Sequence, residues 1–385
     1  MYKRKITQEI KILAKNFRVI TVVGPRQAGK TTLCRNAFPD YRYVSLEDPD
    51  TRLYAMEDPR AFLNEYRRYI IFDEIQRVPQ LLSYIQAIVD EDQLNAQFIL
   101  TGSHQLELSG AISQSLAGRT ALLTLLPLSF EEIAQQNQGF EHWLLQGFMP
   151  GKHDRGIDAS RFYRAYFQTY IERDVRLLVK LKDFVKFENF VRLCAGRIGQ
   201  LLNQASLAND LGVAPSTISE WLSVLEASFI VFRLHPYHEN FGKRLIKSSK
   251  LYFVDTGLAV WLLGIETEAQ IRRDPQKGNL FENLVVVEAL KAHLNRGKDP
   301  RLYFFRDSRG NEVNLIVQQG RQLAPFEIKS SMTWHSSFTK GLSYFHKLTG
   351  EKSVKGTVVY TGKEARKATD YNLLPFHDIA GLGSR

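Results

Sequence analysis

The stretch VITVVGPRQAGKTTLCR, from Val19 to Arg35, decides the fold. An apolar run leads into a loop of the form GxxxxGK(S/T), and a helical pattern follows the loop. Backbone N–H groups of such a loop turn toward bound phosphates, and the helix adds its positive amino end. A glycine turn followed by a surface lysine is the alternative. The flanking strand and helix favour a nucleotide-binding loop in a parallel sheet.

This loop gives roles to individual side chains. Lys30 is predicted to reach the β- and γ-phosphates of ATP, and Thr31 is predicted to bind Mg²⁺. We therefore predict ATP and Mg²⁺ as cofactors. The predicted nucleotide-binding residues run along the loop and into the helix: Gly24, Pro25, Arg26, Gln27, Ala28, Gly29, Lys30, Thr31 and Thr32.

Short apolar runs alternate with helical patterns over the first third of the chain. This alternation predicts an α/β fold with a parallel sheet. From about residue 129 to 182 the pattern becomes helical. The expected strands are RVITVV (18–23), YRYVSL (41–46), RYIIFD (68–73), AQFILTG (96–102) and RTALLTLLPL (119–128).

Two acids stand at the end of the third run, in YIIFDE from Tyr69 to Glu74. Open α/β sheets bind ligands at the carboxyl ends of their strands, so Asp73 is predicted to hold Mg²⁺. Glu74 is predicted to be the catalytic base that polarises the attacking water. An acid that simply ends a strand is the alternative.

Three further positions are candidates for the same site. Thr101 or Ser103, in FILTGS, is predicted to hydrogen-bond the γ-phosphate or the attacking water, although Thr-Gly-Ser also suits a plain turn. Arg119, in SLAGRT, is predicted to stabilise charge on the γ-phosphate of its own subunit or of a neighbouring one. A surface arginine is the alternative.

Composition limits the class of protein. The chain has 385 residues, of which 44% are hydrophobic and 24% are charged, which predicts a soluble protein of two or three domains. Two distant cysteines match no metal or redox spacing, and we find no secretory signal and no apolar run long enough to span a bilayer. We expect a cytoplasmic protein without a membrane partner. A net charge of +10 indicates either an anionic partner or a generally basic surface.

Several motifs together resemble the AAA-type (AAA+) P-loop ATPases of bacteria and archaea: GPRQAGKTTL, IFDEIQRVP, FILTGS, SLAGRT and LPLSFEEI. YFQTYIERDV and KLYFVDTGLA also match the group in which the ATPase domain precedes a winged helix and a restriction-endonuclease-like region. The resemblance covers nearly the whole chain. It implies an AAA-like sheet order and a ring-forming homo-oligomer. The expected domains are 1–135 (ATPase), 136–182 (helical lid or linker), 183–264 (winged helix) and 265–385 (restriction-endonuclease-like).

A helix-turn-helix pattern lies in the third expected domain. QASLANDLG (204–212) and PSTISEWLSVLEA (215–227) predict two helices that pack through apolar residues. The second helix presents Ser216, Thr217, Ser219 and Glu220, and a following wing carries Lys243, Arg244, Lys247 and Lys250. Basic wing residues are able to meet DNA phosphates without reading sequence. Winged helices also serve as packing modules, so DNA contact and domain packing both stay open.

The last expected domain carries a degenerate nuclease pattern. Restriction-endonuclease-like sites combine an acid, an E-x-K strand and a nearby helical glutamate, which hold Mg²⁺ and orient water. The corresponding residues here are Glu282, Asn314, Glu327 and Lys329. Asn314 stands where the pattern has Asp, so one negative charge is missing, although Glu312 lies on the same strand face. We expect no metal-dependent cleavage of DNA.

These patterns predict a Mg²⁺-dependent ATPase that acts as a switch or motor near DNA. Two alternatives stay open: a nucleotide-gated DNA nuclease, and a scaffold whose assembly with a protein partner is controlled by ATP. The sequence does not define how the energy of ATP is used.

Overall fold

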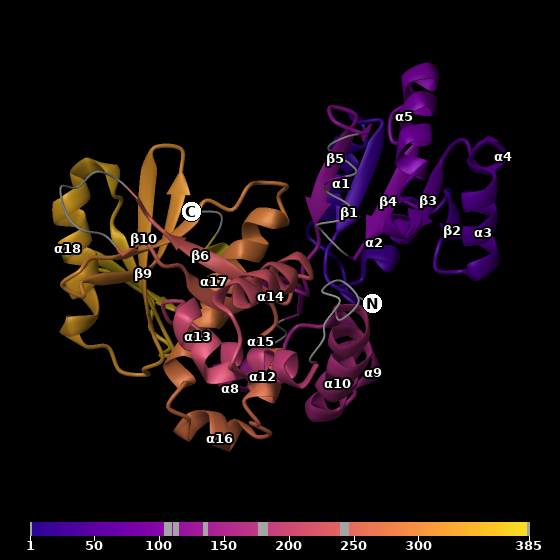
Figure 1. Cartoon of the computed structure of the whole chain (residues 1–385). Coiled ribbons are helices and arrows are strands. Elements are labelled where there is room, and N and C mark those ends of the chain that lie inside the picture. The colour runs from indigo at the N-terminus through magenta and orange to yellow at the C-terminus, as the bar shows by residue number, and fades with distance from the viewer. Residues whose placement is uncertain are drawn as a thin grey trace.

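The chain folds around two β-sheets that lie at opposite sides of the molecule (Figure 1). Within the described residues, a five-stranded sheet forms the amino-terminal part and an eight-stranded sheet the carboxy-terminal part. Helices lie between and around them. The computed structural model describes residues 2–103, 110, 115–133, 138–175, 184–238 and 246–382.

The amino-terminal sheet has the predicted parallel strands. β1, β3 and β4 are mostly apolar and are buried along their whole length, as expected of strands covered on both faces. The strand order is β2-β3-β4-β1-β5, and every pair is parallel. The predicted α/β fold is confirmed. The strands are β1 (Val19–Val23), β2 (Arg42–Ser45), β3 (Ile70–Asp73), β4 (Phe98–Gly102) and β5 (Thr120–Thr124).

Helices cover both faces of this sheet. α1 (Thr7–Leu13) and α2 (Lys30–Ala37) bury Ile10 and Leu33 against one face. The other face is covered by α4 (Pro59–Glu65) and α5 (Leu81–Asp92), which bury Phe62 and Ile85 against Phe72. α3 (Pro49–Glu57) and α4 each start with an aspartate cap followed by proline, a strong helix-start signal. A 3₁₀ turn, η1 (Ile75–Arg77), follows β3.

A helical segment follows the sheet and leads into a β-hairpin. The hairpin strands β6 and β7 are antiparallel, and Leu201 forms an isolated bridge with Lys250 of β7. The elements are α7 (Phe130–Ile133), α8 (Phe140–Gln146), α9 (Pro150–Arg155), α10 (Ala159–Tyr166), the π-helix η2 (Phe167–Val175), α12 (Phe184–Ala195), α13 (Gln204–Leu211), α14 (Pro215–Ala227), β6 (Val231–Pro236), β7 (Lys250–Phe253), α15 (Thr256–Leu262) and α16 (Glu268–Arg273).

The carboxy-terminal sheet is mixed and includes this hairpin. Its order is β12-β13-β11-β10-β9-β8-β6-β7, because β6 pairs in parallel with β8. The sheet therefore continues across the domain boundary expected after residue 264. The remaining elements are α17 (Lys277–Leu294), β8 (Leu302–Arg306), β9 (Glu312–Gln319), β10 (Gln322–Lys329), η3 (Ser336–Thr339), α18 (Lys340–Thr349), η4 (Gly350–Lys352), β11 (Gly356–Tyr360), β12 (Arg366–Lys367), β13 (Tyr371–Pro375) and η5 (Phe376–Gly381).

A buried contact joins the start of α15 to α10 and to the loop between α8 and α9. Asp255 caps α15 by accepting from Leu258 N at 3.1 Å, and it accepts from Phe148 N at 2.8 Å. Beside it, a Cβ atom on Gly257 would lie 2.4 Å from the ring of Tyr163. Glycine is therefore needed there for steric reasons.

Within the described part of the chain, we find no helix with the length and apolar character needed to cross a bilayer.

We predict that Gly257→Ala lowers the free energy of unfolding by about 1–3 kcal/mol, because the added methyl group overpacks the contact with Tyr163. Gly278→Ala is the matched control, since its Cβ would meet only Ser330 Oγ, at 3.7 Å. The control is expected to be neutral or slightly stabilising, because alanine favours a helix. Urea unfolding of both variants measures the difference; equal stabilities would contradict the steric argument.

Candidate active site

The phosphate loop connects β1 to α2 and is shaped by two glycines. Gly24 has a φ of 153°, and a Cβ atom there would lie 2.0 Å from Leu125 O. Gly29 has a φ of 91° and precedes the first turn of α2. Side chains are strongly disfavoured in both conformations, so the glycines allow the backbone to close into a cradle at the amino end of α2.

Lys30 lies inside this cradle. Its Nζ donates to Gly24 O at 2.9 Å and to Pro25 O at 3.0 Å, and the residue is buried. Burial lowers the pKa of Lys30, while the nearby charges of Glu74 and Asp73 act in the opposite direction. The ammonium group is therefore held by loop carbonyls close to two carboxylates.

Asp73, at the end of β3, is surrounded by hydroxyl groups. Thr31 Oγ1 lies 3.0 Å from both carboxylate oxygens, Thr101 donates to Oδ1, and Tyr43 donates to Oδ2 at 2.8 Å. Carboxylate and hydroxyl oxygens are ligands that suit Mg²⁺. Tyr43 was not predicted; its place on β2, directly beside β3, is the signal that indicates it.

Glu74 has a constrained backbone and a constrained side chain. Its φ of 57° and ψ of 49° lie in the left-handed region, which is sparsely populated by residues other than glycine. Its Oε2 accepts from Gln76 Nε2 and from Ser103 Oγ, the latter at 2.9 Å. Burial raises the pKa of this carboxyl group, but Lys30 and the two hydrogen bonds outweigh burial and lower the pKa. Glu74 is thus ionised and fixed in direction.

Thr101 and Ser103 therefore both lie at the site. Thr101 contacts the carboxylate of Asp73, and Ser103 contacts that of Glu74. Their predicted contacts with a γ-phosphate or a water stay predictions.

Two adjoining pockets follow the loop. One, of about 450 Å³, contains Lys30, Thr31, Asp73 and Glu74. The other, of about 320 Å³, lies beside Thr32, Leu33 and Asn36 of α2 and is more apolar. A charged pocket beside a more apolar one suits the phosphates and the base of a nucleotide. Pro150 and Asp154 of α9 line both pockets, a contribution that no motif indicated.

Arg119 lies at the opposite edge of the sheet. Its carbonyl accepts from Val19 N at 3.1 Å, so it precedes β5 at the amino ends of the parallel strands. The five residues of β5 separate Arg119 from the other end of the strand, where the phosphate loop lies, by on the order of 16 Å. The guanidinium group of Arg119 instead binds Asp90 through two contacts of 2.7 Å. The predicted contact with its own subunit's nucleotide is therefore wrong; the contact with a neighbouring subunit stays a prediction.

The candidate nuclease residues come together around α17. Asn314 Nδ2 donates to Glu282 Oε2 at 2.8 Å, and Asn314 Oδ1 accepts from Ile328 N at 2.9 Å. Because Ile328 N–H is a donor, the amide oxygen must face the backbone and the amide nitrogen must face Glu282. The only Asn314 atom able to bind a metal, its amide oxygen, therefore already accepts a backbone hydrogen bond. Lys329 pairs with Glu327 Oε1 at 2.6 Å.

Lys250 belongs to this cluster and not to a DNA-contacting surface. It is 2% exposed, and its Nζ lies 2.8 Å from Glu282 Oε1 and 2.5 Å from Glu312 Oε1. Burial opposes the charge on Lys250, but the two glutamates outweigh burial and raise its pKa. The prediction that Lys250 is an exposed wing residue is wrong, because long-range sheet pairing turns β7 toward α17. A buried ammonium group thus neutralises the carboxylates.

Of the other predicted DNA-contacting residues, Lys247, Ser216, Ser219 and Glu220 are exposed. Thr217 is half-buried. Lys243 and Arg244 lie outside the described residues.

Comparison with known proteins gives the family. The chain is 34% identical over 319 residues to "Uncharacterized protein Rv2008c" of Mycobacterium tuberculosis and to "Uncharacterized protein Mb2031c" of Mycobacterium bovis, which covers 82% of this chain and 71% of each relative. A family model described as "AAA domain" matches residues 16–134. The chain belongs to this family of AAA-domain proteins. Two domains of unknown function, DUF8612 and DUF4143, match residues 137–269 and 277–379.

Two solved structures show a distant similarity to parts of this chain. The "walker-type atpase paby2304 of pyrococcus abyssi" is 15% identical, covers 67% of this chain and 94% of its own, and has a TM-score of 0.43. AMPPCP-bound DnaA from Aquifex aeolicus is also 15% identical, covers 57% of this chain and 85% of its own, and has a TM-score of 0.30.

Glu327 gives this AAA-domain protein a predicted pH dependence. Its Oε2 is buried without a hydrogen-bond partner, and burial raises its pKa from the usual 4.5 to about 7. A raised pKa means that the folded state holds the proton more tightly, so the stability contribution is complete below pH 4.5 and is lost as pH rises through about 7.

We predict that Glu327→Gln gains stability relative to the native protein, on the order of 1–3 kcal/mol, between about pH 5 and pH 8. Thermal unfolding at both pH values measures this gain. Glu351→Gln, at an exposed position, is the control and is expected to show no pH-dependent gain. An identical pH profile for the native protein and Glu327→Gln would contradict the assignment.

Proposed function

We propose that the chain is a Mg²⁺-dependent ATPase. The observation that supports it most is the meeting of Lys30, Asp73 and Glu74 around one pocket at the amino end of α2. The residues present suit the two cofactors. The loop and α2 offer N–H groups to phosphates, and Thr31 and Asp73 offer oxygen ligands to Mg²⁺.

In this proposal each side chain has one task. Lys30 exchanges its contacts with loop carbonyls for the phosphate oxygens. Asp73 and Thr31 hold the metal, while Tyr43 and Thr101 keep the Asp73 carboxylate in its direction. Glu74, ionised and directed by Gln76 and Ser103, accepts a proton from the attacking water. Bound Mg²⁺ supplies neutralisation of the developing phosphate charge.

We predict that Lys30→Ala abolishes tight ATP binding and that Glu74→Gln leaves binding intact but lowers the rate of hydrolysis about 10²–10⁴-fold, because glutamine cannot accept the proton. Fluorescent-nucleotide titration and phosphate release measure the two effects. Glu91→Gln, at the exposed end of α5, is the control. Hydrolysis by Glu74→Gln at the native rate would refute the role as base.

We further propose that the ATPase acts near DNA through a winged helix. Its support is the order α12, α13, α14 and the β6–β7 hairpin, with the Leu201–Lys250 bridge in the position of the short strand of such modules. Glu220 on the outer face of α14 and the burial of Lys250 weaken a phosphate-binding role. The alternative of an ATP-controlled scaffold therefore stays beside it. Stimulation of hydrolysis by duplex DNA distinguishes the two.

The proposed cellular setting is a homo-oligomer in the cytoplasm. Cys34 and Cys194 are buried free thiols, which suits a reducing compartment. A contact of Arg119 with the nucleotide of a neighbouring subunit would require such an assembly.

The nuclease alternative is disfavoured by Lys250 and by the direction of the Asn314 amide. We predict that the protein does not nick plasmid DNA in Mg²⁺ or Mn²⁺, and that Asn314→Asp alone does not restore cleavage, because the ammonium group of Lys250 still occupies the carboxylate cluster. The double variant Asn314→Asp/Lys250→Met is expected to bind Mn²⁺ in calorimetry, whereas Asn314→Asp is not. Native nicking that Lys329→Ala removes would show that the site is active.

A further inference from the structure

The segment from Leu125 to Phe130, which runs into the LPLSFEEI motif (126–133), lies directly against the phosphate loop. Leu125 O is so close to Gly24 that a Cβ atom there would lie 2.0 Å away. The segment links β5 of the nucleotide-binding sheet to α7. A change in the loop on nucleotide binding would therefore act on this segment through the contact between Gly24 and Leu125.

Arg4 holds the loop and the segment together. Its Nη1 donates to Ala28 O of the loop at 2.7 Å, and its Nη2 donates to Leu126 O of the segment at 2.6 Å. Its Nε donates to Glu132 at 3.1 Å, and both side chains are almost fully buried. A planar guanidinium group reaches three acceptors in fixed directions, which a lysine cannot do.

α17 holds the same segment from the other side. Glu288 Oε2 accepts from Phe130 N at 2.7 Å. Lys291 Nζ donates to Leu128 O and to Glu288 Oε1, both at 2.8 Å. Both charged side chains are buried, so each depends on its partners, because an unpaired buried charge is strongly unfavourable.

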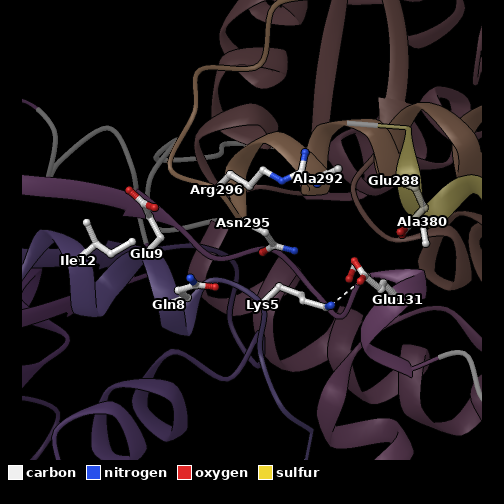
Figure 2. Close-up of a pocket in the computed structure, with 11 residues that line it drawn as sticks. Lys5, Gln8, Glu9, Ile12, Glu131, Glu288, Ala292, Asn295, Arg296 and Ala380 are labelled. Atoms are coloured by element: carbon white, nitrogen blue, oxygen red, sulfur yellow. Dashed lines mark hydrogen bonds and ion pairs between the residues drawn. The ribbon is translucent and has the colours of Figure 1, made fainter. Parts of the chain in front are cut away.

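Glu132 joins the two sets of contacts. It accepts from Ser129 N at 2.9 Å and from Lys5 N at 2.7 Å, in addition to Arg4. Beside them a pocket of about 310 Å³ lies between α1 and α17, with Lys5 and Glu131 on one side and Glu288 in its wall (Figure 2). The buried polar contacts beside this pocket thus link the phosphate loop to α17 by way of residues 126–132.

We propose that Arg4 is a positioning residue of the nucleotide site and that it couples the phosphate loop, through residues 125–132, to α17. This inference rests on the proposed nucleotide binding. The loop binds phosphate best when Arg4 fixes Ala28, and α17 fixes the segment on which Arg4 also depends. Coupling of this kind is reciprocal, so nucleotide in the loop stabilises the contacts of α17, and loss of those contacts weakens nucleotide binding.

Nucleotide titration of the full chain tests whether Arg4 and Glu288 affect nucleotide affinity through one pathway. With a non-hydrolysable ATP analogue and Mg²⁺, Arg4→Lys is expected to weaken affinity at least tenfold. Glu288→Gln, which lines neither nucleotide pocket, is expected to weaken it at least threefold. In the double variant the loss should be smaller than the product of the single losses, because both changes break one pathway. Glu131→Gln, a surface neighbour of Glu132, should change affinity less than twofold.

Hydrogen exchange tests whether bound nucleotide stabilises α17. The analogue should slow amide exchange in α17 of the native protein and of Glu131→Gln, but not in Glu288→Gln at saturating analogue. Native binding with unchanged exchange in α17, or independent effects of Arg4→Lys and Glu288→Gln, overturns the coupling and leaves the proposed ATPase intact. Absence of nucleotide binding by the native protein overturns both. The native exchange measurement decides the matter even if Arg4→Lys fails to fold.

Discussion

The parallel direction of five strands is the constraint on which the nucleotide site depends. Because β1, β3 and β4 run the same way, the residues that follow them meet at one edge of the sheet. The phosphate loop, Asp73 with Glu74, and Thr101 with Ser103 each follow one of these strands. Three short motifs distant in sequence therefore form one hydrogen-bonded group. The same constraint sends residues that precede a strand, such as Arg119, to the far edge.

In the carboxy-terminal half, the constraint is the pairing of the buried charges that α17 carries. α17 is buried along nearly all its length, and it carries Glu282, Glu288 and Lys291 into the interior. A helix apolar on all sides is expected in a core, but one with buried charges needs partners from other elements. Those partners are Lys250 from β7 and the backbone of residues 128–130. The charges therefore determine which segments α17 contacts, as well as adding stability.

The sequence predicted the parts whose signal is local. The phosphate loop with its flanking strand and helix lies within the 19 residues from Val19 to Ala37, and Asp73 with Glu74 ends a buried run, so spacing alone indicates them. Tyr43, Pro150 and Asp154 carry no motif, because they reach the site only through strand order and through the packing of α9. Lys250 was misplaced for a related reason: its burial depends on β6 pairing with β8, whose paired residues lie 68 positions further along the chain (His235 with Tyr303). Arg119, in contrast, was open to correct prediction, since it stands at the start of a strand expected to be parallel.

The proposed coupling requires that α17 move as one body, and the sequence and packing of α17 suit this requirement. Glu282 and Glu288 are six residues apart, about 9 Å along a helix, with no proline between them. The helix is enclosed by apolar neighbours, so a local adjustment at one end costs packing unless the whole helix follows. Under the proposed coupling, a shift at Phe130 that moves Glu288 would also displace Glu282 and the Lys250 cluster. In the proposed coupling, the carboxylate cluster around Lys250, disfavoured as a nuclease site, is the far anchor of a helix that responds to the phosphate loop.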